Sequence, residues 1–398
     1  MTQAPPIGPR PLDDILVVSI EQAIAAPYCA RMLADQGARV IKVERPDGGD
    51  FARHYDTRVN GLSSHFVWCN RSKESLALDL KNPEAVAVVK KLIARADVFI
   101  QNLAPGAANR LGLDEAELRA NNPRLVTCSI SGFGEDGPYG DRKAYDLLIQ
   151  AEAGFLSVTG TPDTLTKSGI SVADIAAGVT AYHSILAALL NRARTGVGDH
   201  IEVSMLEAMA EWMGYPMYFG YDGAPPPPRA GAGHASIFPY GPFPTQDGTV
   251  LFGIQNDREW ASFCHEVLEN PEMADDPRFR GNEGRATHRE AITAAINAAL
   301  TQMTSKSAME RLNRAAIATA EVRTIKELWA HPQLSARDRW QNVETSAGEV
   351  PALTPITGKG WSPVMEAVPG LGDQTEDIFT ELGLSAETRA RLAPSKET

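Results

Sequence analysis

Residues 15–43 read ILVVSIEQAIAAPYCARMLADQGARVIKV, with two short apolar runs on either side of a helical run. Ile15–Ser19 is rich in β-branched residues, which is typical of a strand buried on both faces of a parallel sheet. Residues 26–36 have helical spacing and end near Gly37, and Arg39–Val43 predicts a second strand. The whole stretch has about the length of one strand–helix–strand unit. It therefore predicts two parallel strands joined by a helix.

The same alternation continues through the first half of the chain. Residues 82–96 predict a helix that Asn82 opens and in which Pro83 takes the first helical position. Further elements follow in order: a strand at Val98–Gln101, a helix at Glu115–Asn121, a strand at Leu125–Ile130, a long helix at Asp174–Arg194 and a strand at His200–Val203. Strands that alternate with helices predict an α/β fold with a parallel sheet.

The second half of the sequence has a different composition and a different pattern of expected elements. Gly223–His234 contains four consecutive prolines and several glycines, which predicts a loop or linker. Beyond it we expect a strand at Thr249–Gly253 and helices at Glu259–Leu268 and Ala291–Leu312. We therefore expect three segments: a large domain over residues 1–204, a smaller α+β domain over 205–322, and residues 323–398 returning to the large domain.

Composition narrows the class of protein. The chain has 398 residues, 43% of them hydrophobic and 22% charged, which is the balance of a soluble globular protein. A net charge of -12 argues against binding nucleic acid. No apolar run reaches the roughly 18 residues that span a membrane, and no secretion signal is evident, so we expect a cytoplasmic protein. The four cysteines are far apart and the histidines lack metal-ligand spacing, so neither disulfides nor a metal is expected.

Four basic residues occur at predicted turns: Arg45, Lys73, Arg110 and Lys143. The ends of strands form the ligand crevice of open α/β sheets, so cations gathered there could bind phosphates. On spacing alone, ordinary surface charge explains them as well. Gly231–Ser236 has only part of a dinucleotide fingerprint and does not lie between a strand and a helix, which disfavours a nicotinamide cofactor.

Asp174 is unusual because it begins an apolar helix. It could serve as a helix cap. It could also be a covalent nucleophile, since the positive end of a helix is expected to keep a carboxylate ionised.

Several motifs together resemble the class III CoA-transferases, which include formyl-CoA transferase and carnitine CoA-transferase. The resemblance covers nearly the whole chain. The motifs are Ala25–Pro27, Leu33–Pro46, Gly48–Asp50, Asn70–Lys81, Asn102–Gly112, Ser131–Gly134, Asp174 with Arg192–Gly196, and Pro369–Thr375.

The resemblance implies a Rossmann-like large domain, a small domain and an interlocked homodimer. It implies an acyl-CoA and small carboxylic acids as substrates, with no permanently bound cofactor. Asp174 would then carry the acyl group and afterwards CoA as an aspartyl thioester. The positions that the resemblance assigns to CoA contact are Ile24, Arg45, Lys73, Asn102, Leu103, Arg110 and Lys143.

The α-methylacyl-CoA racemases resemble this chain too, and they use a histidine directly before the acidic residue that matches Asp146. Here that position is Tyr145, a poor proton acceptor because a phenol has a pKa near 10. Formyl-CoA transferase has a glutamate at the position of Asp146. We therefore expect Asp174, Asp146 and Tyr145 to serve CoA transfer rather than racemisation. A non-catalytic CoA-binding protein is a third hypothesis, which the presence of Asp174 disfavours.

The sequence carries fewer signals for the identity of the acids that exchange CoA. Formyl-CoA transferase has a glutamine where Ile24 stands, which argues against oxalate as the specific substrate. The general pattern is closer to members that act on dicarboxylates such as malate, citramalate, mesaconate or itaconate, with succinyl-CoA as donor. Candidates for binding a second carboxylate are Arg71, Arg229 and His234. Backbone N–H groups of Gly231–Gly233 could stabilise charged intermediates, and a flexible linker is an equal interpretation of that stretch.

Overall fold

The computed structural model describes residues 8–392, which form two compact units. The large unit runs to Ala153, resumes at Ser168–Met213 and takes up the chain again from Leu334. The small unit consists of Gly154–Lys167 and Gly214–Gln333. The small unit thus differs from the expected domain of residues 205–322: residues 205–213 belong to the large unit, whereas residues 154–167 and 323–333 belong to the small one.

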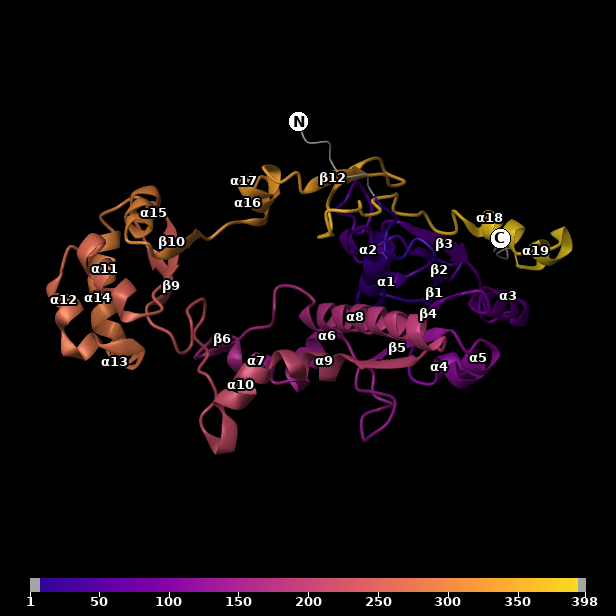
Figure 1. Cartoon of the computed structure of the whole chain (residues 1–398), viewed down its shortest axis with the longest axis horizontal. Coiled ribbons are helices and arrows are strands. Elements are labelled where there is room, and N and C mark those ends of the chain that lie inside the picture. Colours follow the sequence, from indigo (N-terminus) through magenta and orange to yellow (C-terminus); the bar gives the residue numbers. More distant parts are fainter. Residues whose placement is uncertain (1–7, 393–398) are drawn as a thin grey trace. The chain divides into compact units, whose positions relative to one another are not determined.

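A six-stranded parallel sheet forms the centre of the large unit (Figure 1). The strand order β3-β2-β1-β4-β5-β8 is that of a Rossmann-like sheet. This confirms the predicted parallel sheet, although the sequence analysis missed β3. The strands are β1 (Leu16–Ile20), β2 (Arg39–Glu44), β3 (Lys73–Ala77), β4 (Val98–Gln101), β5 (Val126–Ser131) and β8 (His200–Ser204).

Helices connect these strands close to where the sequence predicts them. Asn82 caps α3 by accepting a hydrogen bond from the Glu84 backbone N–H, as the Asn-Pro pair indicates. The helical elements of the large unit before β8 are α1 (Ala25–Asp35), η1 (Phe51–His54), α2 (Ser64–Asn70), α3 (Pro83–Ile93), α4 (Ala107–Arg110), α5 (Glu115–Asn121), α6 (Asp146–Glu152) and α8 (Val172–Thr195); α9 (Met205–Trp212) follows β8.

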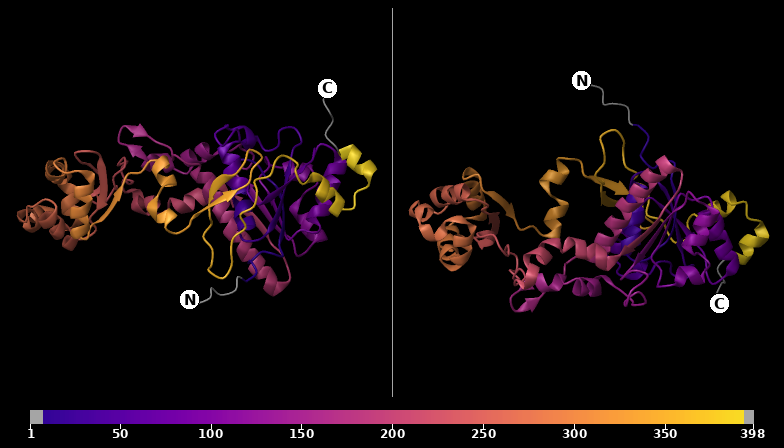
Figure 2. Two further views of the ribbon diagram at one scale, coloured as in Figure 1. Left: turned by 90° about the horizontal axis from the view of Figure 1, so that it is seen from above. Right: turned by 60° about the horizontal axis from the view of Figure 1, so that its bottom comes forward.

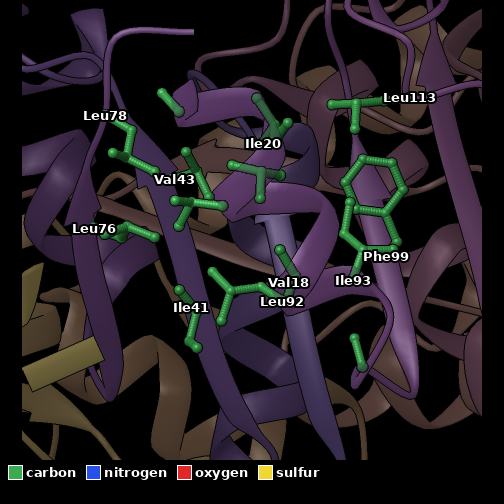
Figure 3. Packing of buried hydrophobic residues seen from close by; sticks show 14 of the residues in the cluster. Val18, Ile20, Ile41, Val43, Leu76, Leu78, Leu92, Ile93, Phe99 and Leu113 are labelled. Carbon is green, nitrogen blue, oxygen red and sulfur yellow. The ribbon is translucent and has the colours of Figure 1, made fainter. Parts of the chain in front are cut away.

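One apolar cluster fills the space between the sheet and α3 (Figure 3). Val18, Ile41 and Leu76 reach it from three neighbouring strands, and each is fully buried. The C-terminal helices α18 (Thr375–Glu381) and α19 (Ala386–Leu392) add Ile378 and Phe379 to the same cluster. Figure 2 shows these two helices, in yellow, beside α3. The end of the chain is therefore part of the large unit's core.

Other C-terminal residues close a second cluster. The antiparallel strands β12 (Trp340–Val343) and β13 (Val350–Leu353) follow the short helix α17 (Pro332–Ser335). Val343 and Val350 pack with Phe66 of α2. The segment that contains β12 and β13 therefore packs against α2 of the large unit.

The helix α8 has 24 residues and is apolar enough to cross a membrane by length and composition. It packs against α1, α9, β5 and β8, and its Arg192 pairs with Asp97 at 3.0 Å. These contacts identify α8 as a core helix of the large unit. The prediction that it begins at Asp174 is wrong, since Ser171 is the N-cap and Val172 the first helical residue.

The small unit has its own core around an antiparallel sheet of order β11-β10-β9. These strands are β9 (Tyr240–Pro244), β10 (Thr249–Gly253) and β11 (Ala318–Glu321). The surrounding helices are α11 (Asp257–Glu266), α12 (Glu272–Asp275), η3 (Pro277–Phe279), α13 (Gly281–Thr287), α14 (Arg289–Leu300) and α15 (Ser305–Arg314). The remaining elements are α7 (Phe155–Val158), β6 (Gly160–Thr161), β7 (Thr164–Leu165), α10 (Gly214–Phe219), η2 (Tyr221–Gly223) and α16 (Ile325–Trp329).

The predicted single helix at Ala291–Leu312 is wrong, because the structure divides it between α14 and α15. Thr304 causes the division by capping α15, where its side chain accepts a hydrogen bond from the Ser307 backbone N–H. The predicted loop is confirmed, since residues 224–239 contain no helix or strand. Cys29, Cys69, Cys128 and Cys264 are free and buried, as expected.

Candidate active site

Asp174 lies in the first turn of α8, one turn before a close helix contact. A Cβ atom at Gly178 would lie 2.7 Å from the carbonyl oxygen of Ala25, so only glycine lets α8 approach the start of α1 this closely. Residues four apart share one face of a helix. The side chain of Asp174 therefore belongs to the face that α8 turns toward the β1–α1 turn.

The surroundings of Asp174 keep its carboxyl group protonated to a higher pH than usual. Val172, Ala173, Ala176 and Ala177 are buried around it and offer no polar partner. Burial, with the charge of Asp146 as the second cause, raises the pKa of Asp174 from 3.8 to about 7. The expectation that the helix end keeps this carboxylate ionised is therefore wrong, because desolvation and a like charge outweigh the helix dipole.

Asp146 connects α6 to the start of α8. It is the first residue of α6, and Oδ1 accepts a hydrogen bond of 2.8 Å from the Ala173 backbone N–H. Oδ2 accepts one of 2.6 Å from Nε2 of Gln150. The structure thus brings the predicted pair Asp146 and Asp174 together, and it adds Gln150, which the sequence analysis missed.

Two tyrosines stand near the carboxyl group of Asp174. Tyr145 is the N-cap residue of α6 and is 65% exposed. Burial and the charges of Asp50, Asp174 and Tyr145 raise the pKa of Tyr55 to about 12. Tyr55 therefore stays a phenol and can donate a hydrogen bond. The sequence analysis missed it; its nearest signal is its place five residues after the quoted motif Gly48–Asp50.

A network of buried charges supports the β1–α1 turn beside Asp174. Lys42 pairs with Asp50 at 2.8 Å, and Asp50 also accepts a hydrogen bond of 3.0 Å from the Ala23 backbone N–H. Ala23 has the left-handed φ of 63°, which an alanine adopts only under constraint. Lys73 pairs with Glu21 at 2.5 Å, and both side chains are fully buried. The prediction that Lys73 lies in a turn is wrong: it is the first residue of β3 and part of this network.

A cavity of about 270 Å³ opens at the carboxyl ends of β1, β2, β3 and β4. Its apolar walls include Val43, Leu78 and Leu111, and the predicted residues Arg45 and Leu103 line it. Lys81, which the sequence analysis did not single out, lies there as well. Carboxylates line the cavity too, but Glu21, Glu44 and Asp50 are already paired with other cations. Apolar walls with two further cations suit a nucleotide that carries phosphates. The location agrees with the ligand crevice expected for this type of sheet.

The other predicted CoA contacts surround this region in different ways. Asn102 exchanges two hydrogen bonds of 2.9 Å with the backbone of Gln22 and so holds the end of β1. Ile24 is buried as the N-cap residue of α1. Arg110 ends α4 and donates to the carbonyl oxygen of Pro105, whereas Lys143 is exposed and does not line the cavity.

The three candidates for binding a second carboxylate differ in their partners. Arg71 is buried and pairs with Asp35 at 2.8 Å. Arg229 donates to the carbonyl oxygens of Thr161 and Pro162. His234 accepts hydrogen bonds on Nδ1 from the backbone N–H groups of Ser236 and Ile237, at 3.2 and 3.0 Å. Across residues 8–392, no group of three acidic, histidine or cysteine side chains is arranged to hold a metal ion.

Comparison with known proteins identifies the class. The model of CoA-transferase family III matches residues 12–375, so the chain belongs to this family. It is accordingly an enzyme of the class III CoA-transferase type, which confirms the resemblance found in the sequence.

Two curated relatives and one solved structure illustrate the match. The succinate–glutarate CoA-transferase of Agrobacterium fabrum is 34% identical over 96% of this chain and 98% of its own length. The acetyl-CoA:oxalate CoA-transferase of Acetobacter aceti is 34% identical over 85% of this chain and 87% of its own length. The crystal structure of a CAIB/BAIF family protein from Brucella suis is 33% identical, has a TM-score of 0.84, and is matched over 94% of this chain and all of that one.

Proposed function

We propose that this enzyme transfers CoA from succinyl-CoA to a second dicarboxylic acid through an aspartyl-CoA thioester on Asp174. The observation that carries the proposal is the Asp174 carboxyl group itself, which is partly exposed in the first turn of α8 and has its pKa raised to about 7, mainly by desolvation. A more basic carboxylate is a stronger nucleophile, and it is largely ionised at slightly alkaline pH.

The transfer proceeds through two acyl exchanges. A carboxylate oxygen of Asp174 attacks the thioester carbonyl carbon, the carbon–sulfur bond breaks, and a mixed anhydride and CoA thiolate result. The thiolate attacks the Asp174 carbonyl carbon of the anhydride, which releases succinate and leaves CoA on Asp174 as a thioester. The acceptor carboxylate then runs the same steps in reverse, so the acceptor leaves as its CoA thioester and Asp174 is regenerated. This is covalent catalysis by a carboxylate.

Residues near Asp174 fit these steps. Each attack places negative charge on a carbonyl oxygen, and a fixed donor lowers the energy of that state. Tyr55 keeps its phenolic proton and is such a donor. Arg45 and Lys81, at the cavity beyond the β1–α1 turn, are assigned to the CoA phosphates. Ile24, Asn102 and Leu103 shape that part of the large unit.

The assignment of dicarboxylates is supported by the names of relatives. The Agrobacterium fabrum relative is named for succinate and glutarate, and others are named for D-citramalate and for mesaconate with succinyl-CoA. The acetyl-CoA:oxalate relative keeps oxalate among the acids to be tested. Arg71, Arg229 and His234 are all engaged with other groups, so we assign none of them to the second carboxylate of the acceptor.

Racemisation needs a second base that faces Asp174. Of the described residues near it, Asp146 already accepts hydrogen bonds on both carboxylate oxygens, and Tyr55 has its pKa raised to about 12, so neither is a free base at neutral pH. No observation on the site favours racemisation over CoA transfer.

Trapping tests the intermediate directly. The enzyme is incubated with succinyl-CoA, treated with hydroxylamine or borohydride, and digested for mass spectrometry. We expect modification at Asp174 in the parent enzyme and none in Asp174→Ala. A parent enzyme that turns over acceptor acids without ever being modified at Asp174 contradicts the covalent route. A screen of glutarate, mesaconate, citramalate, itaconate, malate and oxalate then identifies the acceptor.

A further inference from the structure

We propose that Gln150 is a positioning residue that fixes Asp174 by linking the Asp146 carboxylate to the chain segment that enters α8. This inference rests on the proposed function, in which Asp174 is the nucleophile. It concerns a buried side chain that does not itself contact the reacting atoms.

The side chain of Gln150 uses both ends of its amide. It is fully buried in α6, and its Nε2 donates to Oδ2 of Asp146 at 2.6 Å. Its Oε1 accepts a hydrogen bond of 2.9 Å from the backbone N–H of Ser168. Asp146 in turn accepts the backbone N–H of Ala173 at 2.8 Å. Two side chains of α6 thus hold the backbone at both ends of residues 168–173, directly before Asp174.

This arrangement replaces an ordinary helix cap. The first N–H groups of a helix lack partners within the helix, and a side chain at the N-cap position usually accepts one of them. The N-cap residue of α8, Ser171, makes no such hydrogen bond. Asp146 accepts the Ala173 N–H instead, from a different helix. The start of α8 is therefore held where α6 places it, and α6 places Asp146 through Gln150.

Only a side chain that donates and accepts at once can replace Gln150. An ionised carboxylate can accept from Ser168, but it repels Asp146. A protonated carboxyl group can do both, since its O–H donates to Asp146 and its carbonyl oxygen accepts from Ser168. A thioether such as methionine fills the same space and does neither. These differences allow positioning to be separated from packing.

The test compares Gln150→Met and Gln150→Glu with the parent enzyme in steady-state CoA transfer between pH 6 and 8.5. A 1 Å displacement of a reacting group can cost on the order of 100-fold in rate, so we expect kcat of Gln150→Met to fall roughly 10- to 100-fold. KM for the acyl-CoA should change little, because Gln150 does not line the CoA cavity.

Gln150→Glu gives the readout that a purely structural role would not change. The introduced carboxyl group lies against Asp146, so it becomes protonated as the pH falls and then replaces the amide. The activity of this variant relative to the parent at the same pH should rise as the pH falls. Taking the ratio removes the titration that the two enzymes share. An added negative charge near Asp174 would raise its pKa and lower the ratio at low pH, so this effect cannot produce the expected rise. The ratio for Gln150→Met should stay low at every pH.

Gln374→Met is the matched control, since Gln374 also accepts a backbone N–H, that of Ser75 at 2.8 Å, on β3 rather than on α6 or α8. Its kcat should equal that of the parent. A parental kcat in Gln150→Met, or a ratio for Gln150→Glu that is constant with pH, overturns the proposal. If Gln150→Met does not fold, the pH ratio of Gln150→Glu decides alone. Failure of the proposed function is a separate result, seen as the absence of an Asp174 adduct in the parent.

Discussion

Replacing Asp174 by asparagine should make the protein more stable, and the gain should grow with pH. The pKa of Asp174 is raised from 3.8 to about 7 in the folded chain. A raised pKa means that the folded state holds the proton more tightly than the unfolded state, so stability is lost as the pH rises from about 4 through 7. At 1.36 kcal/mol for each pKa unit, a difference of about 3 amounts to on the order of 4 kcal/mol above pH 7.

An asparagine side chain cannot ionise, so Asp174→Asn should escape this cost. The assay is thermal unfolding of parent and variant at pH 5, 6, 7 and 8, and the measured quantity is the difference in Tm at each pH. We expect the variant to unfold at the higher temperature, with the larger difference at pH 8. Asp141→Asn, at an exposed position of the same unit, is the control and should show no trend with pH. A Tm difference that is constant or shrinks as the pH rises would refute the reasoning, because it would mean that the carboxylate is not desolvated in the folded chain.

Three further predictions follow from the site. The rate of CoA transfer should fall about tenfold per pH unit below pH 7, because Asp174 must be ionised to attack. In Asp146→Asn the acidic limb of the profile of kcat/KM against pH should move to lower pH, because one charge that raises the pKa of Asp174 is removed. Arg45→Gln should raise KM for the acyl-CoA by roughly tenfold with little change in kcat, since a hydrogen bond to a charged group contributes about 1.5–3 kcal/mol, while Arg194→Gln at an exposed position should leave KM unchanged. Asp50→Leu should destabilise the protein by about 3–5 kcal/mol because Lys42 stays buried without this partner, and calorimetry should show no comparable loss for the exposed Asp47→Leu.

Much of the large unit could be predicted from the sequence because its strands carry a simple signal. β1, β4 and β5 are rich in β-branched and apolar residues, and β2 carries Val40, Ile41 and Val43 among its charged residues; a parallel sheet buried on both faces selects such strands. β3 reads KESLA and was missed. Its lysine is buried because a glutamate 52 residues away in sequence neutralises it. Neither periodicity nor composition reveals a charge pair of that kind.

The site was predictable in part for the same reason. The resemblance of the surrounding motifs to the family pointed to Asp174 and Asp146, and their roles remain proposals. Tyr55 is brought near Asp174 by the fold, and Gln150 is linked to Ser168 across 18 residues, so neither relation is visible in the local sequence. The direction of the Asp174 pKa was predicted wrongly because a sequence shows the helix end but not the extent of burial.

The magnitudes explain why burial prevails at Asp174. A helix N-terminus stabilises a nearby carboxylate by about 0.3–2 kcal/mol. The combined cost of burial and of the Asp146 charge corresponds to on the order of 4 kcal/mol, so the dipole cannot offset it. The carboxylate is thus kept basic by the same buried packing that holds it in place: Gly178 against Ala25, and Asp146 against the Ala173 N–H. A solvated aspartate at this helix end would be more stable and less basic, and therefore a weaker nucleophile toward a thioester.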